Sequence, residues 1–157
     1  MRLLGPETYQ LKCDSKKFSV TCRKGTPRFS GIANRRLPKL YLISANGQLI
    51  YVGITRQRMR TRLNMGFRAE GKNGYHGYAW RHDSESVELH IWCHDDASAR
   101  DSDRDVETIE AEIVFLARLQ GQWPSGQTEI HFHESATEHR EIAETIWRSL
   151  GPSTSKK

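Results

Sequence analysis

The chain has 157 residues, of which 27% are charged, and its formal net charge at neutral pH is +5. This length is typical of a single domain that buries a core of its own. No segment approaches the roughly 20 consecutive apolar residues of a membrane span, and the start lacks the apolar core of a secretory signal, so we expect a cytoplasmic protein with no membrane partner.

Basic residues are concentrated in the first part of the chain. Residues 1–68 contain fifteen Lys or Arg and two acidic residues, whereas the rest of the chain contains nine basic and seventeen acidic residues. A basic surface that neutralises phosphates releases their condensed counterions, so this asymmetry indicates a nucleic-acid partner. The alternatives are a basic surface that serves solubility alone and a patch attracted to a membrane, but no amphipathic anchor accompanies the charge.

Residues 1–37 read as a basic N-terminal extension. Alternating residues at 9–13 and 18–22 predict a small hairpin. The basic loops after it suit phosphate contacts but show no regular pattern that would indicate base readout. This extension could act as a DNA-contacting arm, and its expected contacts are Lys24, Arg28, Arg35 and Arg36.

The clearest local signal is a β-hairpin. Two apolar runs, at residues 39–43 and 49–53, flank Asn46-Gly47, the dipeptide that favours a tight two-residue turn. The first strand carries Tyr41 and the second carries Tyr51. Side chains alternate between the two faces of a strand, so the register of the hairpin decides whether these tyrosines share a face.

A helix that carries arginines is expected directly after this hairpin. Met59, Leu63 and Phe67 recur at helical spacing and would dock on the sheet. Arg58 and Arg62 fall on an adjoining stripe, one turn apart. The two guanidinium groups would then lie beside the second strand of the hairpin, although a solvated cationic helix face has the same spacing.

A glycine-rich loop and a further strand follow. Residues 71–78 interleave glycines with aromatic side chains. This segment is either a loop that touches DNA, in which Tyr75 or His76 could help to move a proton, or an ordinary surface loop. Residues 87–92 alternate cleanly and predict a strand of the same sheet.

A second helix is expected over residues 103–120, because a Ser-x-x-Asp opening precedes its apolar stripe and Gly121 is a natural stop. Glu110 lies one turn from both Val106 and Val114, at the apolar edge of this helix. A carboxylate in such a place favours a cation partner. A surface glutamate paired with Arg118 is the alternative.

Three segments complete the chain. Residues 129–134 alternate and predict a strand. Its two histidines could bind a metal, but no third ligand has a suitable spacing, so ordinary surface residues of the strand are the favoured interpretation. Residues 137–150 predict a helix that closes the core, and residues 151–157 predict a flexible tail.

The hairpin, the arginine helix and the glutamate helix together resemble the GIY-YIG nucleases. The two short motifs that name this family correspond to Lys39-Leu40-Tyr41, which keeps only the tyrosine, and Tyr51-Val52-Gly53. The family's helical arginine corresponds to Arg62, and its metal-binding glutamate corresponds to Glu110. A family member also has an asparagine near a proline after that helix, where this chain offers Gln122 or Gln127.

The resemblance implies an α+β fold, a small three-stranded antiparallel sheet flanked by helices, over residues 38–150. It further implies an endonuclease of the restriction type that hydrolyses phosphodiester bonds in double-stranded DNA with Mg²⁺ or Mn²⁺ bound to Glu110. Tyr41 would activate or orient the water, with Tyr51 supporting it, and Arg62 would stabilise the developing charge. One active site per chain would favour a homodimer for cutting both strands.

The remaining site residues are expected from their positions around these four. Supporting roles fall to Arg58, Gly53, Gln122 and His76. Besides the four residues of the N-terminal extension, the expected nucleic-acid contacts are Lys39, Arg56, Arg60 and Lys72. The alternatives are a catalytically impaired nucleic-acid-binding module, a DNA repair nuclease and an RNA-directed nuclease.

Overall fold

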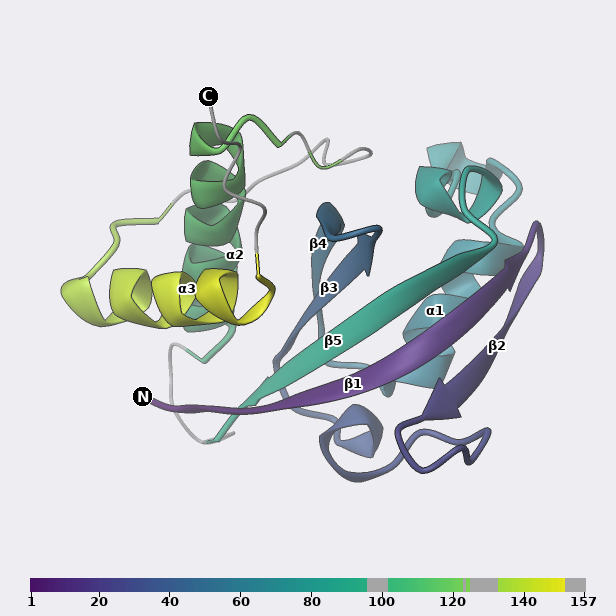
Figure 1. The fold of residues 1–157 in the computed structure, drawn as a ribbon, viewed down its shortest axis with the longest axis horizontal. Coiled ribbons are helices and arrows are strands. Elements are labelled where there is room, and N and C mark those ends of the chain that lie inside the picture. The colour runs from purple at the N-terminus through teal and green to yellow at the C-terminus, as the bar shows by residue number, and fades with distance from the viewer. Residues whose placement is uncertain (96–101, 123, 125–132, 152–157) are drawn as a thin grey trace.

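The computed structural model describes residues 1–95, 102–122, 124 and 133–151 (Figure 1). The strands are β1 (Leu3–Asp14), β2 (Lys17–Cys22), β3 (Lys39–Ala45), β4 (Gln48–Thr55) and β5 (Ser86–His94). The α-helices are α1 (Met59–Arg68), α2 (Ser102–Leu119) and α3 (Thr137–Ser149), and short 3-10 turns lie at Gly31–Asn34, Lys72–Gly74 and Ala79–His82. The expected residues Gln127, 129–132 and 152–157 lie outside the described part of the chain.

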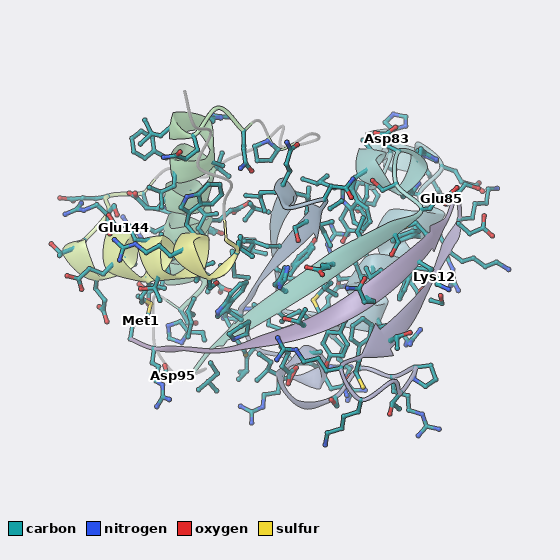
Figure 2. The ribbon with its side chains drawn as sticks, viewed as in Figure 1. Met1, Lys12, Asp83, Glu85, Asp95 and Glu144 are labelled. Atoms are coloured by element: carbon teal, nitrogen blue, oxygen red, sulfur yellow. The ribbon has the colours of Figure 1, made fainter. Side chains whose placement is uncertain are left out.

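The described strands form one antiparallel sheet of five strands in the order β2-β1-β5-β3-β4. The α+β class is therefore confirmed, but the expected count of three strands is corrected to five. The two added strands, β1 and β2, belong to the N-terminal extension. They join the sheet because β1 pairs with β5 over almost its whole length. Figure 2 shows both ends of this pairing, with Met1 near Asp95 at one end and Lys12 near Glu85 at the other.

The two faces of the sheet carry separate apolar cores. The face that carries α1 buries the aromatic residues of the hairpin and of the loop before β5, together with Leu63 and Phe67 of α1. The opposite face packs against α2 and α3, through residues such as Val52, Ile109 and Trp147. Figure 1 shows α2 and α3 together on one side of the strands and α1 on the other. No helix in the described residues is long and apolar enough to cross a membrane.

The β3–β4 hairpin is confirmed, and its register places the two motif tyrosines together. Asn46 and Gly47 both have positive φ, of 52° and 73°, as the favoured tight turn requires. Tyr41 pairs with Gly53, and Ile43 pairs with Tyr51. Since paired residues in an antiparallel sheet point to the same face, Tyr41 and Tyr51 both point toward the core under α1.

Candidate active site

Tyr41 and Tyr51 pack against each other across Gly53. Their ring centroids are 5.8 Å apart. A Cβ atom added at Gly53 would lie 2.5 Å from Cζ of Tyr41 and 2.7 Å from Cε1 of Tyr51. Glycine is therefore needed at position 53 because the two rings occupy the space of its side chain. The supporting role that the sequence predicts for Gly53 has this steric basis.

Tyr78 joins the cluster from the loop before β5. Its hydroxyl lies 2.9 Å from the hydroxyl of Tyr41, in a buried hydrogen bond. Its ring stacks on Trp80 at a centroid distance of 4.8 Å, and it lies where a side chain at Gly66 of α1 would be. Sequence reasoning missed Tyr78 as a site residue, although the interleaved aromatics of residues 71–78 were a usable signal.

Arg62 lies between two aromatic rings. Helix α1 buries Met59, Leu63 and Phe67 and so turns Arg62 toward the tyrosines. Its guanidinium carbon is 5.0 Å from the ring centroid of Tyr78 and 5.8 Å from that of Tyr75, and its Nη1 donates to the Tyr75 hydroxyl at 2.7 Å. Such contacts favour the cation and fix its plane.

The cluster keeps its phenols protonated and its arginine charged. Burial raises the pKa of Tyr41, Tyr51 and Tyr78 above the ordinary value. Burial opposes the charge on Arg62, yet the pKa of Arg62 is raised, because at the high pH where it could lose its proton it faces the ionising phenols of Tyr41 and Tyr78. The hydroxyls therefore act as hydrogen-bond donors near neutral pH, and none is poised as a base.

Glu110 lies on α2, which covers the face of the sheet opposite the tyrosine cluster. Helix α2 runs antiparallel to β4. At one end Arg56 donates to Asp103, and at the other the backbone N–H of Leu49 donates to Gln122 at 3.1 Å. Glu110 lies between these two ends with only 5% of its surface exposed. Burial is the main cause of the raised pKa of Tyr51, and the carboxylate of Glu110 adds to it.

The carboxylate of Glu110 offers the oxygen ligands that Mg²⁺ and Mn²⁺ prefer. These ions prefer oxygen ligands, and Mg²⁺ is often held by one or two carboxylates together with substrate phosphates. No group of three or more His, Cys, Asp or Glu that could hold a metal occurs in the described residues. A lone carboxylate such as that of Glu110 fits a metal that takes further oxygen ligands from a phosphate and from water.

The other supporting residues lie farther from the tyrosines or on the surface. Arg58 precedes α1 and is exposed, and His76 is exposed near the tip of the 71–78 loop. Gln122 is half-buried near the hairpin turn, where its side chain holds the backbone of β4. This contact gives Gln122 a structural role.

Most of the expected nucleic-acid contacts are exposed: Lys24, Arg28, Arg35, Arg36, Arg56, Arg60 and Lys72. Two of them already have protein partners. The guanidinium carbon of Arg60 is 5.5 Å from the ring centroids of both Phe18 and Phe29. Arg56 donates to both oxygens of Asp103, at 2.6 and 2.7 Å.

Lys39 differs from the other expected contacts because its side chain has no exposed surface. Its ammonium donates to the backbone carbonyls of Arg35, Leu37 and Arg56. Burial lowers the pKa of Lys39 to about 8. We therefore correct the expected role of Lys39: it ties the loop before β3 to the loop after β4 and does not offer its charge to a phosphate.

The structure thus brings Tyr41, Tyr51, Gly53 and Arg62 into one cluster, with the charge of Glu110 acting on Tyr51. Comparison of the chain with models of protein families, with curated proteins and with solved structures found no match.

Proposed function

We propose that this chain is a divalent-metal-dependent endonuclease that hydrolyses phosphodiester bonds in double-stranded DNA, with a restriction-type role. One observation carries the proposal: two tyrosines from paired strands and an arginine between aromatic rings form one cluster, and the charge of the buried Glu110 acts on Tyr51 of that cluster. Each of these groups has a use in phosphoryl transfer, in which orientation and charge stabilisation supply most of the catalysis.

Arg62 would stabilise the charge that develops on the phosphate. Its guanidinium stays cationic, and its fork of N–H donors matches phosphate oxygens. Within the described residues it donates one side-chain hydrogen bond, to Tyr75, so most of its donors are available to a substrate.

Tyr41 and Tyr51 would orient the attacking water. A phenol with the ordinary pKa near 10 must gain about 4 kcal/mol of help to act as a base near neutral pH, and burial raises this cost. We therefore assign orientation of the water to these hydroxyls and not its deprotonation. Tyr51 is half-buried and nearer the surface, whereas Tyr41 has no exposed surface and would hold the network from behind.

Glu110 would hold the metal. When bound there, Mg²⁺ or Mn²⁺ supplies Lewis-acid stabilisation of charge on the phosphate oxygens. The low exposure of Glu110 limits competition from water for its carboxylate.

The exposed basic residues would hold the DNA backbone. Lys24, Arg28, Arg35 and Arg36 lie in the loop between β2 and β3, and Arg58 precedes α1. A homodimer would supply the second active site that is needed to cut both strands at once.

A second candidate function is nucleic-acid binding without cleavage. A nucleic-acid-binding module without cleavage is favoured by the complete burial of Tyr41, which leaves its hydroxyl bonded to Tyr78. An RNA-directed nuclease would use the same phosphate contacts.

Conversion of supercoiled plasmid to nicked and linear forms tests the proposal. We expect conversion with Mg²⁺ or Mn²⁺, none in EDTA and none with Glu110→Ala. Tight DNA binding without conversion on several DNA sources would favour the binding module. Competition between matched DNA and RNA duplexes for the labelled protein decides between the two nucleic acids.

A further inference from the structure

The Tyr75 hydroxyl has a hydrogen left to donate. It accepts the Nη1–H of Arg62 at 2.7 Å. No acceptor in the described residues takes the hydrogen of this hydroxyl. A tyrosine hydroxyl can donate and accept at the same time, so the O–H of Tyr75 and the remaining N–H groups of Arg62 form a set of neighbouring donors.

This donor set lies at the surface. Tyr75 is 40% exposed, whereas Tyr41 and Tyr78 are buried. Arg62 is half-buried between the rings of Tyr75 and Tyr78. A group that approaches from solvent would therefore meet the Tyr75 hydroxyl and the free edge of Arg62 together.

The loop that carries Tyr75 is fixed at its base. Arg81 is 8% exposed and donates to the backbone carbonyls of Gly66 and Ala69 at the end of α1. The tip closes on itself, because the N–H of Gly71 donates to the carbonyl of Tyr75 at 2.9 Å. Gly71 has a φ of 88°, a left-handed conformation that glycine adopts without strain. Tyr75 is thus presented to Arg62 by a compact turn on an anchored base.

We propose that Tyr75 is a substrate-binding residue that donates its hydroxyl hydrogen to the phosphate contacted by Arg62, while it accepts from Arg62 and holds the guanidinium in plane. This inference rests on the proposed function, because it names a group that helps Arg62 to bind the phosphate. A neutral donor adds a hydrogen bond to the phosphate without adding charge.

Binding of a fluorescent DNA duplex in EDTA tests this role without cleavage. We expect Tyr75→Phe to keep the ring over Arg62 but to bind the duplex about tenfold to a hundredfold more weakly, as loss of a hydrogen bond to a charged group predicts. The slope of log affinity against log salt stays unchanged for Tyr75→Phe. Arg62→Gln removes a charge and lowers that slope by about one.

The double variant and a stability measurement separate binding from a structural role. If both residues hold one phosphate, the affinity losses of Tyr75→Phe and Arg62→Gln are less than additive in the double variant. Tyr75→Phe is expected to unfold in urea at the wild-type midpoint. Wild-type affinity in Tyr75→Phe, a changed salt slope or fully additive losses would each overturn the inference.

Failure of the inference and failure of the proposed function give different results. A wild type that binds the duplex but does not cut plasmid overturns the nuclease function, and the binding comparison still decides the role of Tyr75. A wild type that binds no duplex overturns both. Arg148→Gln, which removes an exposed charge from α3 on the other side of the sheet, is the matched control and should bind close to wild type.

Discussion

Alanine at position 53 should disturb both stability and the tyrosine cluster. The added Cβ would lie 2.5 Å from Cζ of Tyr41, 2.6 Å from its hydroxyl oxygen and 2.7 Å from Cε1 of Tyr51. Ordinary Cβ contacts begin at 3.4 Å. Tyr41 has no exposed surface into which its ring could swing, so the cost comes from moving packed neighbours.

The size of the effect follows from overpacking a tight core. We expect Gly53→Ala to lower the free energy of unfolding by about 1–3 kcal/mol. The melting temperature would fall by about 2–4 °C for each kcal/mol in a chain of this length. Displacement of Tyr41 would also break its hydrogen bond to Tyr78, so plasmid conversion should fall more than the loss of folded protein explains.

Urea unfolding and plasmid conversion, both measured where the variant is folded, test this prediction. Gln48→Ala changes an exposed residue of the same strand and should alter the unfolding free energy by less than about 0.5 kcal/mol. A Gly53→Ala variant as stable and as active as wild type would refute the steric reasoning and the placement of both rings.

Three further predictions concern charge and protonation. The folded pKa of Lys39, about 8, lies below its unfolded value, so above pH 8 the unfolded chain binds more protons than the folded chain. Lys39 therefore makes the free energy of unfolding rise with pH, by up to about 1.4 kcal/mol per pH unit. Lys39→Met should flatten this rise when urea unfolding is measured between about pH 8 and 10. Arg56→Gln should cost less than about 1 kcal/mol, because Asp103 and Arg56 are half exposed, and a double-mutant cycle measures the pair. The buried phenols of Tyr41, Tyr51 and Tyr78 keep their protons in the folded state at a pH where the unfolded chain loses them. The free energy of unfolding should therefore fall above about pH 10, and tyrosinate absorbance should rise on unfolding at that pH.

Local sequence signals predicted the elements that carry the site. The Asn46-Gly47 turn fixed the hairpin because it leaves few backbone choices, and the 3.6-residue spacing after it located α1. The second helix was expected at residues 103–120 and spans Ser102–Leu119. The expected placement of Glu110 at the apolar edge is borne out by its 5% exposure.

Long-range contacts were not accessible to such reasoning. Pairing of β1 with β5 joins residues between 74 (Lys12 with Ser86) and 91 (Leu3 with His94) positions apart, and no local pattern specifies that register. The expected phosphate contact of Lys39 is wrong, because lysine is rarely buried but here carbonyls from two separate loops surround its ammonium. Tyr78 reaches the cluster only because its loop folds back onto α1.

Comparison of Glu110→Gln with Glu112→Gln in plasmid conversion tests the central claim most directly. Both variants remove one carboxylate from α2, but Glu112 is half exposed two positions farther along the helix. With Mg²⁺ present, we expect Glu110→Gln to bind DNA without converting plasmid and Glu112→Gln to cut like wild type. Equal cleavage by the two variants, or equal loss in both, would contradict the assignment of Glu110 and of the tyrosine cluster as the active site.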